Sequence, residues 1–302
     1  MRVGVIMGGT SSEREVSLMT GREMIANLDR EKYELYPIEI NSKDELVEQV
    51  KHIDVALLAL HGKYGEDGTI QGALETLCVP YTGCGVLSSS LSMDKNISKK
   101  LFRNEGIPTP DWIHLSSIDE LSIGAVERLG YPVIVKPNSG GSSIGIQIIK
   151  NKETLVPEVH ETFRWDDEVL IEPYISGEEI TCSILNGKLL PIIAIRSKSE
   201  FFDYSSKYDD GGADEQVIQL PPDIFEQVRA SALGCYKTLK CSVYARIDMI
   251  LKDGIPYVME VNTLPGLTKN SLLPKSAKAA GISFSQLLDF IIEYSLKERK
   301  KT

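Results

Sequence analysis

Two turn dipeptides, Asn186-Gly187 and Asp253-Gly254, constrain the fold of the second half of the chain most strongly. Such dipeptides form the tight turns of β-hairpins when runs of apolar residues flank them. The runs that flank these two are Ile180–Leu185 and Leu190–Ile195 for the first, and Tyr244–Leu251 and Tyr257–Asn262 for the second. The sequence therefore predicts a mostly antiparallel sheet from Glu178 onward.

The first third of the chain follows a different pattern, in which strands alternate with helices. Helices are predicted to begin near Glu13 and to span Lys43–Val50. The strands between them are predicted at Val3–Met7, Glu34–Ile40 and Val55–Leu60. This βαβ order predicts a parallel sheet, and the polar loop 61–68 follows its third strand. Loops at the carboxyl ends of parallel strands form the sites of such sheets.

The central part begins near Pro108-Thr109-Pro110, where prolines mark a boundary. A helix is predicted at Ile118–Leu129, and a glycine-rich loop over 138–145 joins two predicted strands as a hairpin. A P-loop differs, because a helix follows its glycines. Further strands are predicted at 132–137, Ile146–Ile149 and Val169–Glu172, and an amphipathic helix at Phe284–Leu296. The fold class is therefore α/β combined with α+β.

Composition excludes several classes of protein. A chain of 302 residues suits two or three domains. The net charge of −10 argues against a nucleic acid or an anionic membrane as partner. Neither a signal peptide nor a run of about 20 apolar residues is visible. The five cysteines show no CxxC spacing, so a zinc site or a disulfide framework is not expected, and a reducing cytoplasm is.

The second hairpin carries the most specific chemical signal. Arg246 and Asp248 share one face of their strand, and Glu260 and Asn262 share one face of the next. A five-residue loop, Lys252–Pro256, would place Asp248 opposite Glu260 and would keep the proline out of the ladder. Two carboxylates and an amide in this arrangement suit Mg²⁺, which prefers oxygen ligands. The alternative is an ordinary solvent-exposed hairpin face.

Three other segments are candidates for binding. Lys136 ends an apolar strand, where an ammonium group needs an anion, and the loop after it either closes over phosphates or is merely flexible. Glu13 either binds an ammonium group or only stabilises its helix N-terminus. Ser271 either binds a carboxylate with nearby backbone N–H groups or lies in an ordinary loop. His61 is the only histidine in a candidate site loop, and the four histidines form no zinc ligand set.

Taken together, these segments resemble the D-alanine–D-alanine ligase family. The likeness covers nearly the whole chain in one order. The matching runs are Gly8–Ser17, His61–Gly72, Pro80–Lys95, Val133–Gly145, Val169–Glu179, Phe202–Tyr208, Arg246–Met249, Glu260–Thr268 and Ser271–Pro274. The resemblance implies an ATP-grasp fold, in which an N-terminal α/β domain (1–94) precedes two mainly antiparallel domains (95–176 and 177–302) that clamp ATP. The long polar segment 197–215 is predicted to be a lid.

The resemblance also implies the reaction and its participants. ATP would phosphorylate one D-alanine, the amine of a second would attack the acyl phosphate, and the dipeptide would serve peptidoglycan synthesis. The expected cofactors are two Mg²⁺ (or Mn²⁺), with a monovalent cation such as K⁺ as a further candidate. Relatives of this kind are commonly homodimers.

Residue roles follow from the matched positions. Glu13 would hold the first ammonium, with Ser142 and Tyr208 tying the lid to it and His61 beside the substrate. Arg246 and the Gly266 N–H would stabilise the oxyanion. The remaining expected contacts are Lys95, Lys136, Ser143 and Lys207 for the phosphates and the adenine region; Glu172, Tyr174, Ile175 and Glu179 for adenine and ribose; Asp248, Glu260 and Asn262 for the metal ions; and Ser271 and Leu272 for the second carboxylate.

Two departures and two alternatives remain. Pro173 stands where many relatives have a Lys, and the Asn138–Gly141 loop lacks charged residues that some relatives carry. Neither position has a catalytic role. Another ATP-grasp enzyme, such as a carboxylase, would give no reason for the Glu13 run or for Lys207-Tyr208. A non-enzymatic ATP-binding protein would not need the metal carboxylates, Arg246 and a carboxylate site together.

Overall fold

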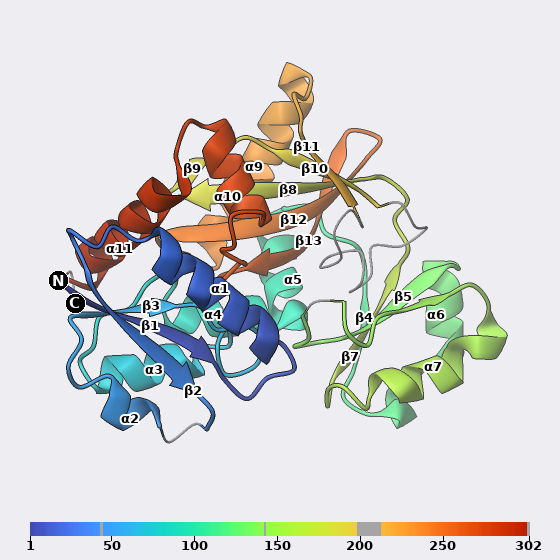
Figure 1. Cartoon of the computed structure of the whole chain (residues 1–302). Helices are drawn as coiled ribbons and strands as arrows, with labels where there is room; N and C mark the ends of the chain where they lie inside the picture. Colours follow the sequence, from blue (N-terminus) through green and yellow to red (C-terminus); the bar gives the residue numbers. More distant parts are fainter. Residues whose placement is uncertain (43–44, 142, 198–212, 301–302) are drawn as a thin grey trace.

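The computed structural model describes residues 1–42, 45–141, 143–197 and 213–300. Within these ranges the chain forms three sheets, one parallel and two antiparallel (Figure 1). Most of the predicted lid, including Lys207 and Tyr208, and also Ser142, lies outside the described residues. No helix in the described part of the chain combines the length and the apolar character that crossing a membrane requires.

The N-terminal sheet is parallel, as predicted, with strand order β2-β1-β3. Its strands are β1 (Arg2–Gly8), β2 (Glu34–Ile40) and β3 (Val55–Leu58). Helix α1 starts directly after Glu13, which places this carboxylate at the carboxyl end of β1. The helices of this part are α1 (Arg14–Asn27), α2 (Leu46–Gln49), α3 (Thr69–Thr76), α4 (Val86–Met93) and α5 (Lys95–Asn104).

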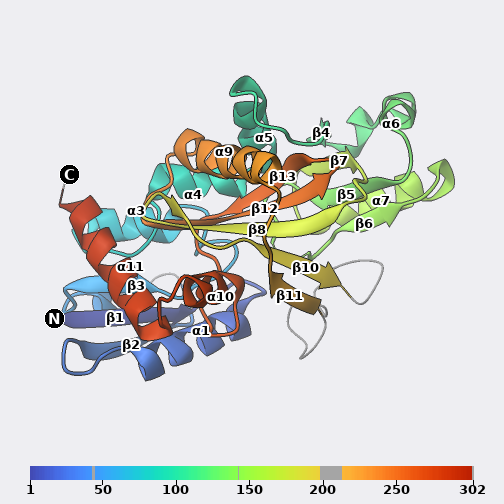
Figure 2. The ribbon, with the colours of Figure 1, turned by 90° about the horizontal axis from the view of Figure 1, so that it is seen from above.

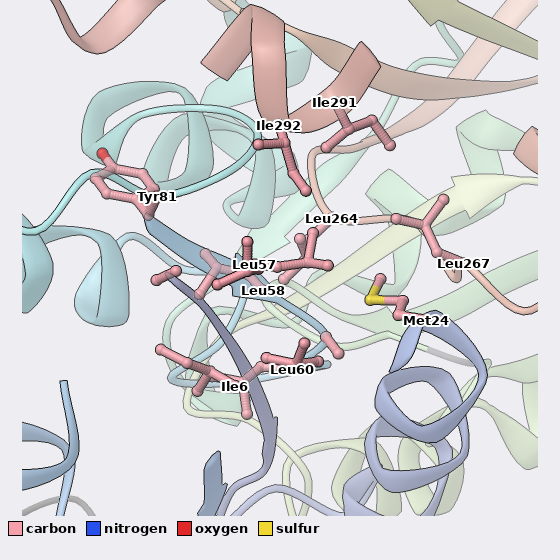
Figure 3. Close-up of a cluster of buried hydrophobic side chains, with 14 of the residues drawn as sticks. Ile6, Met24, Leu57, Leu58, Leu60, Tyr81, Leu264, Leu267, Ile291 and Ile292 are labelled. Carbon is pink, nitrogen blue, oxygen red and sulfur yellow. The ribbon is translucent and has the colours of Figure 1, made fainter. Parts of the chain in front are cut away.

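The C-terminal helix α11 (Phe284–Arg299) packs against the N-terminal sheet. Figure 3 shows Ile292 extending toward Leu57 and Leu264, and all three side chains are buried. Lys32 in the N-terminal unit also binds Asp289 of α11 through an ion pair of 2.6 Å. The first and last parts of the chain therefore share one hydrophobic core, and the predicted domain boundaries at 94/95 and 176/177 stay a prediction.

The middle sheet is antiparallel, with order β4-β7-β5-β6. The prediction of one helix at Ile118–Leu129 is wrong in one respect, because the segment forms two helices, η1 and α6. Ser122 interrupts it, because its hydroxyl accepts a hydrogen bond from Ala125 N and so starts a new helix. The elements are β4 (Ile113–Leu115), η1 (Ile118–Glu120), α6 (Ile123–Leu129), β5 (Val133–Pro137), β6 (Gln147–Ile149), η2 (Lys152–Thr154), α7 (Leu155–Thr162) and β7 (Val169–Pro173).

The C-terminal sheet has the order β11-β10-β8-β12-β13, with β9 paired to β8. Figure 2 shows α9 on one side of this sheet and α10 on the other. Ile247 packs on the α9 side, whereas Arg246 and Asp248 alternate with it and face the other side. The elements are β8 (Glu178–Leu185), β9 (Lys188–Leu189), β10 (Ile193–Ser197), β11 (Ala213–Val217), α9 (Pro222–Thr238), β12 (Tyr244–Lys252), β13 (Ile255–Asn262) and α10 (Leu272–Ala279).

The β12–β13 hairpin has the predicted register but not the predicted loop. Asp248 lies opposite Glu260, and Arg246 lies opposite Asn262. The loop is a two-residue turn in which Asp253 and Gly254 both have positive φ, so Pro256 pairs with Leu251 instead of staying outside the ladder. The register is recovered by a β-bulge after Asp248, which leaves Met259 without an opposite residue.

Candidate active site

A cavity of about 570 Å³ lies between the middle and C-terminal sheets. Strands of both sheets line the cavity, together with the loops that follow them. The hydrogen bonds of each sheet fix the backbone that carries the side chains on the strands. The predicted site residues that line the cavity are Lys95, Lys136, Ser143, Tyr174, Ile175, Glu179, Asp248 and Glu260. Pro173 lines it as well.

One side of the cavity is cationic. Lys95 is the first residue of α5, and its ammonium donates to the Gly140 carbonyl at 2.6 Å and lies 3.5 Å from Glu260 Oε2. Asn138 anchors the glycine-rich loop to the same helix end, because its Oδ1 accepts from Asn96 N at 2.9 Å. The loop therefore starts from a fixed point beside Lys95 and Lys136, and two ammonium groups at this position suit the binding of phosphate groups.

Glu172 differs from its expected place. Its carboxylate is fully buried and is not among the residues that line the cavity. Lys136 Nζ lies 2.9 Å from Oε2, and Lys99 Nζ lies 3.1 Å from Oε1. Burial alone would raise the pKa of Glu172, but the two ammonium groups hold this pKa below its ordinary value. Glu172 thus orients Lys136 in this structure, and its predicted role at the adenine and ribose pocket stays a prediction.

The acidic hairpin face is tightly connected. Arg246 forms two hydrogen bonds with the Asp248 carboxylate, at 2.9 and 2.7 Å. Asn262 Nδ2 and Thr181 Oγ1 donate to the same carboxylate, at 2.9 and 2.7 Å. Asp248 therefore has a fixed position next to Glu260, in a partly buried and charged environment.

This donor set fits Mg²⁺. Two carboxylates and an amide oxygen face one side of the hairpin, and Mg²⁺ sites commonly use one or two carboxylates together with substrate phosphates. Among the residues that the structure describes, no cluster of three or more His, Cys, Asp or Glu side chains forms a separate metal cage. Phosphate oxygens of a nucleotide in the adjoining cavity would thus supply the remaining ligands of a metal ion at this site.

Glu13 lies between the turn that follows His61 and the glycine-rich loop. Gly62 has a φ of +71°, and a methyl group added to it would lie 2.7 Å from Glu13 Oε2. A methyl group on Gly141 would lie 3.5 Å from the same oxygen. The His61 ring nitrogens contact Thr20 Oγ1 at 3.2 Å and Glu66 Oε1 at 3.4 Å. Because Gly141 also lines the nucleotide cavity, the Glu13 carboxylate adjoins that cavity.

The loop before α10 brings Gly266 and Ser271 together. Ser271 is the residue that precedes α10, yet its hydroxyl does not cap the helix. Instead it bonds to Thr268, at 3.2 Å from the backbone N and 2.8 Å from Oγ1. A methyl group on Gly266 would lie 3.1 Å from Ser271 Oγ. The N–H groups at the start of α10, including that of Leu272, are therefore left for an anion such as a carboxylate.

Sequence reasoning missed two buried residues of this region, Lys99 and Thr181. Lys99 follows Lys95 by four residues, so both lie on one face of α5, and this spacing is the signal that could have found it. Thr181 stands opposite Asp248 in the ladder, but nothing in its local sequence points to that partner. The predicted contacts Ser142, Lys207 and Tyr208 lie in the part of the chain that is not described.

A cavity between two antiparallel sheets, lined by two lysines and by two carboxylates of one hairpin, is the arrangement of an ATP-grasp enzyme. Comparison with known proteins narrows this class. Residues 101–293 match the family described as "D-ala D-ala ligase C-terminus", and residues 2–51 and 41–84 match "D-ala D-ala ligase N-terminus".

Individual relatives of known sequence or structure support the same family. A D-alanine–D-alanine ligase from Bacillus anthracis is 62% identical over 301 residues, which covers 100% of this chain and 99% of the relative. A crystal structure of the B. anthracis enzyme complexed with ATP superimposes with a TM-score of 0.92 at 59% identity, covering 100% and 99% of the two chains. A D-Ala:D-Ser ligase from Enterococcus faecalis has a TM-score of 0.85 at 31% identity, covering 97% and 99%.

The chain belongs to the D-alanine–D-alanine ligase family. It is an ATP-dependent ligase, and the fold and enzyme class expected from the resemblance are confirmed.

Proposed function

We propose that this chain joins two molecules of D-alanine to D-alanyl-D-alanine, a peptidoglycan precursor, with conversion of ATP to ADP and phosphate. The observation that carries the proposal is the position of Gly141. This residue lines the nucleotide cavity and also lies against Glu13, so a terminal phosphate and an amino-acid ammonium would be held side by side.

Each site residue has a separate role in this reaction. Glu13 pairs with the ammonium of the first D-alanine, whose carboxylate attacks the terminal phosphorus of ATP and becomes an acyl phosphate while ADP leaves. Lys95 and Lys136 offset the phosphate charges. The second D-alanine is held by its carboxylate at Ser271 and Leu272, and its amine attacks the acyl carbon. Arg246 and the Gly266 N–H stabilise the oxyanion before phosphate leaves.

The expectations on oligomeric state and location rest on membership of the family, whereas the metal site rests also on the acidic hairpin face. We infer that two Mg²⁺ bind at Asp248, Glu260 and Asn262, where each ion would neutralise phosphate charge. The residues predicted to help exclude water from the acyl phosphate, Ser142, Lys207 and Tyr208, lie outside the described part of the chain. A monovalent cation such as K⁺ as a further candidate ligand, a homodimer and a cytoplasmic location complete the proposal.

The test is ADP release by the purified protein with ATP, Mg²⁺ and one amino or hydroxy acid at a time. Release should depend on D-alanine and should be much slower with L-alanine or D-lactate. D-Serine is a necessary arm, because a relative of the same fold is a D-Ala:D-Ser ligase. Release that needs no amino acid would overturn the proposal, and the identity of the dipeptide is checked by mass spectrometry.

Substitution Glu13→Gln should separate the amino-acid site from the nucleotide site. We expect the KM for D-alanine to rise about tenfold or more, because an ammonium group loses its charged partner, whereas the KM for ATP changes little. The matched control is Glu15→Gln, an acid of the same helix end whose side chain is 83% exposed. Equal D-alanine KM values in the Glu13→Gln variant and the parent would contradict the assignment of Glu13.

A further inference from the structure

Lys99 is a buried charge to which the mechanism above assigns no role. It lies on α5, one helical turn after Lys95, and only 1% of its surface is exposed. Placing an ammonium group in a protein interior is costly unless it is paired and hydrogen-bonded. A chain that keeps a lysine here thus needs contacts that offset this cost.

The contacts of Lys99 reach both walls of the nucleotide cavity. Its ammonium lies 3.1 Å from Glu172 on β7, in the middle sheet, and donates to Thr109 Oγ1 at 2.8 Å. The Thr109 hydroxyl in turn donates to the carbonyl of Val258 on β13, in the C-terminal sheet, at 2.9 Å. Lys99 and Thr109 together therefore link the two sheets between which the cavity lies.

Each end of this link leads to a residue that faces the cavity. On one side, Glu172 holds Lys136 at 2.9 Å, and Lys136 lines the cavity. On the other side, Val258 immediately precedes Met259, the residue of the β-bulge, and Glu260, and both line the cavity. A shift of Lys99 would therefore move a phosphate-binding lysine and a metal-binding carboxylate relative to each other.

We propose that Lys99 is a positioning residue that sets the spacing of the two sheets around the nucleotide and keeps the Lys136–Glu172 pair net cationic. This proposal rests on the proposed ligase function. Two ammonium groups and one carboxylate carry a net charge of +1, whereas Lys136 and Glu172 alone would be neutral. The phosphates would then meet a weaker positive field.

The surroundings of Lys99 add a pH readout. Burial lowers the pKa of Lys99 to about 8. The Glu172 carboxylate opposes this shift, and the positive charges of Lys136 and Arg103 add to it. Its other neighbours are the Thr109 hydroxyl and the ring of Trp112, 5.3 Å away. Lys99 is protonated below this pKa, so nucleotide affinity should be full at lower pH and should fall as pH rises through about 8.

The experiment measures ADP binding by calorimetry from pH 6.5 to 9.5, without amino acid, together with kcat and the KM for ATP. In Lys99→Met we expect ADP affinity to fall about tenfold or more and the pH dependence near 8 to disappear. The control is Lys100→Met, the exposed neighbour on the same helix, which should bind ADP as the parent does. Parent-like ADP affinity and pH dependence in Lys99→Met would overturn the proposal.

A second variant keeps the test valid if Lys99→Met does not fold. Thr109→Val retains every charge but removes the link from Lys99 to Val258, so kcat should fall about fivefold or more while ADP affinity changes little. An unchanged kcat would overturn the proposed link between the sheets. A parent protein that binds ADP but shows no release dependent on D-alanine would refute the ligase proposal instead, so the two failures are distinguishable.

Discussion

Replacing Glu260 by Gln is expected to lower kcat by about 10³-fold or more at limiting Mg²⁺, because several kcal/mol of charge stabilisation is lost with one carboxylate. The side chain keeps its size, so the β12–β13 register and its bulge should persist. Glu260 also lies 3.5 Å from Lys95, and the variant leaves that ammonium without its carboxylate. The measurement is ADP release across a titration of Mg²⁺ and, separately, Mn²⁺.

The Mg²⁺ titration distinguishes a metal ligand from a residue that only supports the fold. A lost ligand should move the Mg²⁺ dependence to higher concentration, whereas a loss of stability would lower activity equally at all concentrations. Glu226→Gln is the matched control, since Glu226 forms an exposed ion pair with Arg229 and contributes little. An unchanged Mg²⁺ dependence in Glu260→Gln would exclude Glu260 as a ligand.

Substitution Arg246→Lys should reduce kcat by about 10²- to 10³-fold with a smaller effect on either KM, which is the range for a lost oxyanion contact. The guanidinium holds Asp248 with two parallel hydrogen bonds and lies opposite Asn262. Lysine keeps the charge but has no planar fork, so it cannot bind Asp248 and an oxyanion in the same geometry.

Single-turnover kinetics would show which step is affected. Formation of the acyl phosphate should slow less than the attack on it if Arg246 acts mainly on the oxyanion. Arg229→Lys is the control because this arginine forms an exposed ion pair with Glu226. Activity of Arg246→Lys close to that of the parent would show that charge alone suffices and that the paired geometry is not required.

The β12–β13 hairpin shows how far the sequence can predict this fold. The pairing of Asp248 with Glu260 was predicted correctly from an incorrect loop, because two different turns can produce one register when a bulge is present. A signal for the bulge existed: Val258 and Val261 are both buried, although residues three apart on a regular strand face opposite sides. Strand patterns thus predict which segments pair more reliably than how they turn.

Buried charges account for what the sequence could not predict about the site. Lys136 and Lys95 stand in distinctive motifs, whereas Lys99 looks like any lysine on an amphipathic helix. Its burial depends on Thr109, Glu172 and Val258, which come from three distant segments. The resemblance predicted a ligand contact for Glu172, and nothing in the sequence around Glu172 reveals that two lysines enclose its carboxylate.

The packing of α11 on the N-terminal sheet bears on how the chain is made. A ribosome releases the strands of that sheet long before α11, yet Leu57 and Leu58 belong to the same buried cluster as Ile291 and Ile292 of that helix. Until α11 has also emerged, the N-terminal segment lacks the partner that covers these apolar side chains in the folded protein. During this interval the uncovered apolar side chains favour aggregation, and slow translation of the chain before α11 would prolong that interval.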